Sequence, residues 1–220
     1  MKDQYTKNLE ELVKQIIKPL KKVPLKKVPF NLIIESIYNK KVLPFDRSNL
    51  QNKTLFENLK KASEDAGRAV NKVGGISSKR VNEVGNYIES FVEKSLKKVG
   101  YEALSQVTKS GKNKSAGYPD LQFKDEFGRI CYLECKTFNL KNVATTQRSF
   151  YLSPSSDPKV NSDGFHFVLS FEIEPHAKKF HCASYKLLSI ENLSCDLKHE
   201  FNSDNKRLCA KELILAEGRF

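Results

Sequence analysis

The spacing of apolar residues changes at Gly100, and this change constrains the fold more than any other feature of the chain. Before Gly100 the apolar residues recur every three or four positions, which predicts amphipathic helices. After it they alternate with polar residues, which predicts strands. The expected helices are residues 9–20, 54–73 and 79–99, and the expected strands are residues 118–123, 129–137, 165–173 and 180–187.

Positive charge is concentrated in the N-terminal part of the chain. The length of 220 residues allows one large domain or two small ones. The formal net charge of +12 indicates a polyanionic partner such as DNA, RNA or an anionic membrane. Residues 1–80 hold 18 Lys and Arg against 8 Asp and Glu, whereas the remaining residues are nearly neutral. We therefore expect a basic helical extension over residues 1–75 that grips the polyanion and contributes to dimerisation.

Cysteine and histidine spacing excludes several kinds of site. The five cysteines form no CxxC pair, and the four histidines form no HxxxH or HExxH pattern. These counts favour reduced thiols over a disulfide framework or a zinc site. No stretch reaches eighteen apolar residues and the N-terminus has no apolar signal core, so we expect a cytoplasmic protein without a membrane span.

Two acidic residues and a lysine are predicted to converge on one hairpin. Glu134 and Lys136 share one face of the strand over residues 129–137, while the apolar Leu133 and Cys135 share the other. A turn near residues 126–127 would bring Asp120 opposite residue 133 or 134. Neighbouring carboxylates repel each other unless they share a cation, and Mg²⁺ prefers oxygen ligands. The alternative is an ordinary surface ion pair on a hairpin.

This constellation resembles the signature of the PD-(D/E)xK nuclease superfamily. Pro119-Asp120 is followed by thirteen residues and then by Glu134-Cys135-Lys136, with an amphipathic helix before the hairpin. The superfamily includes most type II restriction endonucleases. The resemblance implies an α/β (α+β) core, in which helices flank a central mixed β-sheet, over residues 76–220.

The resemblance also implies roles for individual residues. Asp120 and Glu134 would bind Mg²⁺ with the carbonyl of Cys135, and Lys136 would orient and activate the attacking water. A glutamate on the preceding helix commonly completes such a metal site. Glu89 is the candidate here, and Glu83 is the alternative.

Two polar segments beside the motif are candidates for DNA contact. Lys109, Ser110, Lys112 and Lys114 precede the hairpin in a loop suited to phosphate contacts. Gln147 and Arg148 follow it, and side chains of these types read base edges by bidentate hydrogen bonds. A solvated loop remains the alternative for both segments.

The leading hypothesis is a type II restriction endonuclease that cuts double-stranded DNA with Mg²⁺ at a short palindromic sequence. Cutting both strands of a palindrome requires two active sites, so we expect a homodimer. One alternative is a structure-specific nuclease, such as a junction resolvase or a repair nuclease. A non-catalytic DNA-binding protein is another, and membrane-surface binding is the weakest because Glu10 and Glu11 lie on the basic first helix.

Overall fold

The chain forms two compact units. In the computed structural model, one unit comprises residues 1–28 and 195–220, and the other comprises residues 29–194. The structure describes residues 4–22, 25–78, 84–104, 108–112, 117–142, 144, 150–177, 179–198 and 202–216.

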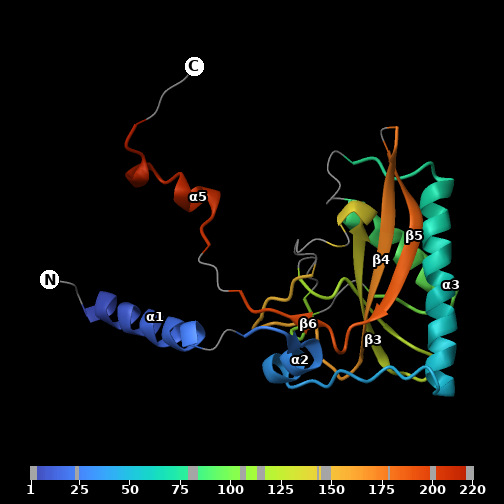
Figure 1. Ribbon diagram of the computed structural model, residues 1–220, viewed down its shortest axis with the longest axis horizontal. Helices are drawn as coiled ribbons and strands as arrows, with labels where there is room; N and C mark the ends of the chain where they lie inside the picture. Colours follow the sequence, from blue (N-terminus) through green and yellow to red (C-terminus); the bar gives the residue numbers. More distant parts are fainter. Residues whose placement is uncertain are drawn as a thin grey trace. The chain divides into compact units, whose positions relative to one another are not determined.

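The larger unit is built on a mixed four-stranded sheet (Figure 1). Its strands lie in the order β2-β3-β4-β5, where β3 pairs parallel with β4 and both outer pairs are antiparallel. The expected α+β fold with a central mixed sheet is thus confirmed. The strands are β2 (Leu121–Lys124), β3 (Ile130–Phe138), β4 (Phe165–His176) and β5 (Lys179–Ser189).

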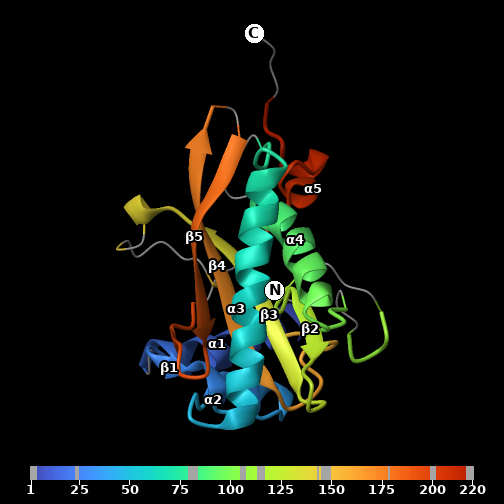
Figure 2. The ribbon, with the colours of Figure 1, turned by 90° about the vertical axis from the view of Figure 1, so that its right-hand side faces the viewer.

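Two helices lie side by side against this sheet (Figure 2). α3 (Leu50–Lys72) packs against α4 and β5, and α4 (Val84–Lys98) packs against α3 and β3. Their apolar faces meet alternate strand residues in one core, as their helical spacing predicts. The core includes Leu55, Leu59, Ala66, Val70, Ile88, Val92, Leu96, Leu121, Leu133, Phe167, Leu169 and Phe171.

Several element boundaries differ from the sequence prediction: α1 (Gln4–Lys22) begins at Gln4 rather than at residue 9, and β4 and β5 extend beyond their predicted ends. Two further differences lie beside the hairpin and the helix layer. α3 begins at Leu50 rather than near residue 54, because the side chain of Asn49 caps it by accepting hydrogen bonds from the N–H groups of Gln51 and Asn52. β2 begins at Leu121 rather than at residue 118. In the residues directly before it, the carbonyls of Gly117 and Pro119 accept hydrogen bonds from the side chain of Lys159.

The predicted boundary at residues 75/76 does not coincide with either boundary between the two units. α3 supplies part of the same core as the sheet and therefore belongs to the larger unit. The functional division into a DNA-gripping extension and a catalytic core stays a prediction. The larger unit also contains α2 (Phe30–Tyr38) and the short 3-10 helix η2 (Leu140–Asn142).

The smaller unit contains α1 (Gln4–Lys22), α5 (Asn205–Leu208) and the short 3-10 helix η3 (Lys211–Leu213). The short strands β1 (Val28–Pro29) and β6 (Ser194–Cys195) pair with each other where the two units join in sequence. α1 is amphipathic as expected, and its apolar stripe is exposed at Tyr5, Leu9, Leu12, Val13 and Ile16. No helix among the described residues is long and apolar enough to span a membrane.

Candidate active site

The β2–β3 hairpin brings the two halves of the acidic motif together. Leu121 pairs with Leu133, so the register places Asp120, the residue before β2, beside Glu134. The backbone N–H of Cys135 donates a hydrogen bond of 2.7 Å to Oδ2 of Asp120. Asp120 is therefore fixed against β3 although it lies just outside β2.

Glu134 and Lys136 form an ion pair on one face of β3. Nζ of Lys136 lies 2.5 Å from Oε1 of Glu134, and the glutamate side chain is almost fully buried while that of the lysine is partly exposed. Leu133 and Cys135 are buried in the core on the opposite face. This arrangement follows the alternation of side chains along a strand. It presents one carboxylate and one ammonium side by side.

α4 contributes a third carboxyl group. Glu89 is half-buried, and burial raises its pKa to about 7, with the negative charge of Asp120 adding to the rise. Lys136 and Lys159 oppose this rise. Glu89 thus lies within electrostatic reach of Asp120 and Lys136, and its role as a metal ligand stays a prediction. The alternative residue, Glu83, lies outside the described residues.

Two lysines, Lys136 and Lys159, face three carboxyl groups in this cluster, and the pKa of each carboxyl group is raised. Burial, followed by the charge of Asp120, raises the pKa of Glu134 to about 7. Burial also raises the pKa of Asp120, against the hydrogen bond from Cys135 and the charges of Lys136 and Lys159. Burial alone would lower the pKa of Lys136, but Glu134 and Asp120 outweigh it and the net shift is upward. Such a site gains stability from an additional cation.

The donor atoms present fit a hard divalent cation. Oε2 of Glu134 is buried and has no hydrogen-bond partner among the described residues, an unusual state for a buried carboxylate oxygen. The nearby candidate metal ligands are carboxylate oxygens, which Mg²⁺ prefers. In the described part of the chain, however, no three His, Cys, Asp or Glu side chains form a ready-made metal site. Binding would therefore require the carboxyl groups to converge further.

Sequence reasoning missed Lys159, which lies in the polar segment before β4. Its side chain is buried, and Nζ donates hydrogen bonds of 2.6 Å to the carbonyl of Gly117 and 3.0 Å to that of Pro119. These carbonyls stand directly before Asp120. Nothing in the local sequence distinguishes Lys159 from the many exposed lysines, because its role depends on contacts about forty residues away in the chain.

Tyr118, which lies between Gly117 and Pro119, is held by a contact with β4. Tyr118 is buried, and its hydroxyl lies 2.7 Å from Nδ1 of His166 on β4. Burial lowers the pKa of His166 to about 3, so its imidazole is neutral. Tyr118 and His166 thus form a buried pair between the start of the motif and β4.

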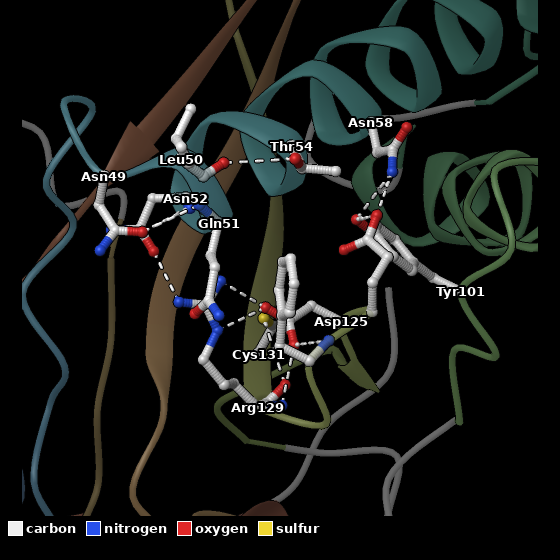
Figure 3. A network of polar contacts seen from close by, with 12 residues as sticks. Asn49, Leu50, Gln51, Asn52, Thr54, Asn58, Tyr101, Asp125, Arg129 and Cys131 are labelled. Carbon is white, nitrogen blue, oxygen red and sulfur yellow. Dashed lines mark hydrogen bonds and ion pairs between the residues drawn. The ribbon is translucent and has the colours of Figure 1, made fainter.

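The opposite end of the hairpin is tied to the N-terminal part of α3 (Figure 3). The carboxylate of Asp125 accepts hydrogen bonds from the backbone N–H and the side chain of Arg129, whose guanidinium also donates to Asn52 at 2.7 Å. Asn58 and Tyr101 lie beside this turn and both contact Glu126. This network fixes the hairpin relative to the helix layer.

The structure describes three of the six residues that the sequence predicts to contact DNA. Lys109, Ser110 and Lys112 are exposed in the loop over residues 108–112. Both the N–H and the hydroxyl of Ser110 donate to the carboxylate of Asp157, at 2.9 Å and 2.7 Å. Ser110 is thus already engaged, whereas the two lysines project from an anchored loop. Lys114, Gln147 and Arg148 lie outside the described residues.

A comparison with known protein families finds a family model that covers this site. Residues 23–212 match the model of the type II restriction enzyme MjaV family. The chain belongs to this family. It is also 37% identical over 227 aligned residues to the type II restriction enzyme MjaV of Methanocaldococcus jannaschii, with 97% of this chain and 96% of that protein covered. No solved structure matches the chain.

Membership of the MjaV family agrees with the resemblance to restriction endonucleases seen in the motif. The family match includes both strands of the hairpin and the helix that carries Glu89. Type II restriction enzymes are site-specific deoxyribonucleases, so the chain is an enzyme of this class and its substrate is DNA.

Proposed function

We propose that this enzyme hydrolyses double-stranded DNA with Mg²⁺ held by Asp120, Glu134 and Glu89, with the carbonyl of Cys135 as a further ligand. The observation that carries this proposal is the buried Oε2 of Glu134, which has no hydrogen-bond partner among the described residues. The negative charge of Asp120 raises the pKa of both Glu134 and Glu89, so Asp120 lies within electrostatic reach of each of them. A bound divalent ion would polarise the scissile phosphate and lower the pKa of a water molecule.

The protein groups have distinct tasks in this proposal. Cys135 holds one carboxylate oxygen of Asp120 through its backbone N–H and so orients the carboxylate toward the cluster. Lys136 keeps its positive charge because the neighbouring acids raise its pKa, so its ammonium is suited to orient the attacking water and to stabilise charge on the phosphate. No covalent nucleophile is needed.

Recognition of a short palindrome by a homodimer is part of the same proposal. The proposed metal site of one chain can cut one strand at a time, and symmetric cleavage of two strands requires a second site related by a two-fold axis. The basic extension over residues 1–75 would grip the duplex and contribute to the dimer, while Lys109, Ser110, Lys112 and Lys114 would contact phosphates. Gln147 and Arg148 are the candidates for reading bases.

Plasmid cleavage tests the proposal directly. Purified enzyme should give discrete fragments with Mg²⁺ and none with a chelator, and the fragment ends should define one palindromic site. Light scattering should give the mass of two chains. Cleavage confined to branched DNA would instead support a structure-specific nuclease, and DNA binding without cleavage under any divalent cation would contradict the catalytic assignment.

A further inference from the structure

Lys159 occupies an unusual position for a lysine. It is only 3% exposed, and among the described residues no other lysine or arginine is buried to this degree. Removing an ammonium group from water is costly unless strong acceptors replace the water. The acceptors that Lys159 finds include two backbone carbonyls at the start of the acidic motif.

The two carbonyls belong to residues on either side of Tyr118. Nζ of Lys159 therefore bridges Gly117 and Pro119, and the second of these is joined by a peptide bond to Asp120. This stretch has no strand partner of its own, since β2 begins only at Leu121. The lysine thus supplies the hydrogen bonds that a neighbouring strand would otherwise provide.

The backbone that carries Lys159 is itself anchored. Asp157, two residues earlier, accepts two hydrogen bonds from Ser110, and the carbonyl of Pro158 accepts one of 3.0 Å from the N–H of Lys109. On the other side, Val160 is buried. The segment over residues 157–160 therefore joins the exposed basic loop to the start of the motif, with Lys159 at the point of contact.

From this geometry we infer that Lys159 is a positioning residue for Asp120, and this inference rests on the proposed role of Asp120. Cys135 fixes the carboxylate of Asp120 from the β3 side, while Lys159 fixes the preceding peptide through its carbonyl. The two contacts together determine where that carboxylate lies relative to Glu134. Lys159 itself does not touch the scissile phosphate in this assignment.

The test compares Lys159→Met, Lys159→Gln and Lys159→Arg with the wild-type enzyme. Lys159→Met should lower kcat at least about 10-fold and weaken Mg²⁺ binding to the DNA-free protein by a similar factor, because supports of metal ligands act on this scale. KM for DNA should change little. Lys159→Arg should restore part of both losses, since it keeps the charge and the donors. Lys179→Met, at the exposed start of β5, is the matched control.

A double-mutant cycle separates positioning from general stabilisation. If Lys159 acts through Asp120, Lys159→Met should cause no further loss of Mg²⁺ affinity in a protein that already carries Asp120→Ala. Wild-type kcat and Mg²⁺ affinity in folded Lys159→Met would overturn the inference, and additive losses would do so as well. Should Lys159→Met fail to fold, the same two measurements on Lys159→Gln decide, because its amide retains a donor.

Different results would overturn the proposed active site and the proposed role of Lys159. Wild-type cleavage by Asp120→Ala would overturn the active site itself. An inactive Asp120→Ala alongside a fully active Lys159→Met would overturn only the role of Lys159.

Discussion

The backbone N–H of Cys135 donates a 2.7 Å hydrogen bond to Oδ2 of Asp120 across fifteen positions of sequence. This bond joins the two halves of the acidic motif. It engages one oxygen of Asp120 and so orients the other. It also holds Asp120 against the strand that carries Glu134 and Lys136, so the three side chains lie in one cluster.

Replacing either Asp120 or Lys136 should abolish cleavage and leave DNA binding intact. Asp120→Ala and Lys136→Ala remove transition-state stabilisation, and kcat should fall at least about 100-fold. Single-turnover cleavage and gel-shift measurements on the same preparations check this. Wild-type cleavage by either variant would contradict the site, whereas loss of DNA binding would indicate a structural role.

Glu89 should matter for metal dependence, and Glu93 provides its control. Both residues lie on α4, but Glu93 pairs with Lys97 at 2.8 Å rather than with the hairpin. Glu89→Gln should lower the apparent affinity for Mg²⁺ by about 10-fold or more, as loss of a metal-site carboxylate does. Glu93→Gln should change it little, because such exposed pairs contribute about 0–1 kcal/mol. Equal effects in the two variants would argue against Glu89 as a ligand.

Without divalent cations, the wild-type protein should lose stability as the pH rises from about 5 to about 8. Folding raises the pKa of Glu134 from 4.5 to about 7, so between these values the folded state binds more protons than the unfolded state. The stabilising contribution is complete below pH 4.5 and is lost as the pH passes about 7.

In Glu134→Gln, the loss of free energy of unfolding over this pH range should be smaller than in the wild type by about 1–3 kcal/mol, because the amide does not ionise. Urea unfolding at the acidic and the basic end of that pH range measures the difference. A variant with the same pH slope as the wild type would show that Glu134 ionises normally in the folded protein.

The hairpin should depend strongly on Asp125 for stability. Asp125 is buried and paired with Arg129 through its carboxylate, so Asp125→Ala leaves a largely buried guanidinium without its carboxylate partner and with only Asn52 as a hydrogen-bond acceptor among the described residues. The expected loss is about 3–5 kcal/mol in the free energy of unfolding. Asp65→Ala, which breaks a pair with the largely exposed Arg68, should cost only about 0–1 kcal/mol. Thermal unfolding of the two variants provides the comparison.

Lys109 and Lys112 should contribute to DNA affinity without setting sequence preference. Both are exposed on the loop anchored to Asp157. Replacing each by Ala should reduce the slope of log K against log salt concentration by about 0.9 for each phosphate that the variant no longer neutralises. Titration of labelled duplex at several salt concentrations measures this slope. A change in the cleaved sequence would instead assign these lysines to base recognition.

Much of this protein follows from local sequence patterns. The periodicity of α3 and α4 fixes which of their residues form the core, because a helix presents every third or fourth side chain to the same neighbour. The alternation along β3 places Glu134 and Lys136 on one face for the same kind of local reason. Together with the PD-(D/E)xK resemblance, these patterns indicated the class of enzyme and the candidate site residues.

Only the tertiary structure decided how that site is held. The role of Lys159 depends on carbonyls about forty residues earlier, and the anchoring of Ser110 depends on Asp157, 47 residues later. No periodic pattern encodes such contacts, since each consists of two hydrogen bonds between segments that are distant in sequence and that packing around the sheet brings together. The sequence thus determined which residues are candidates for the chemistry, and the packing determined which residues orient them.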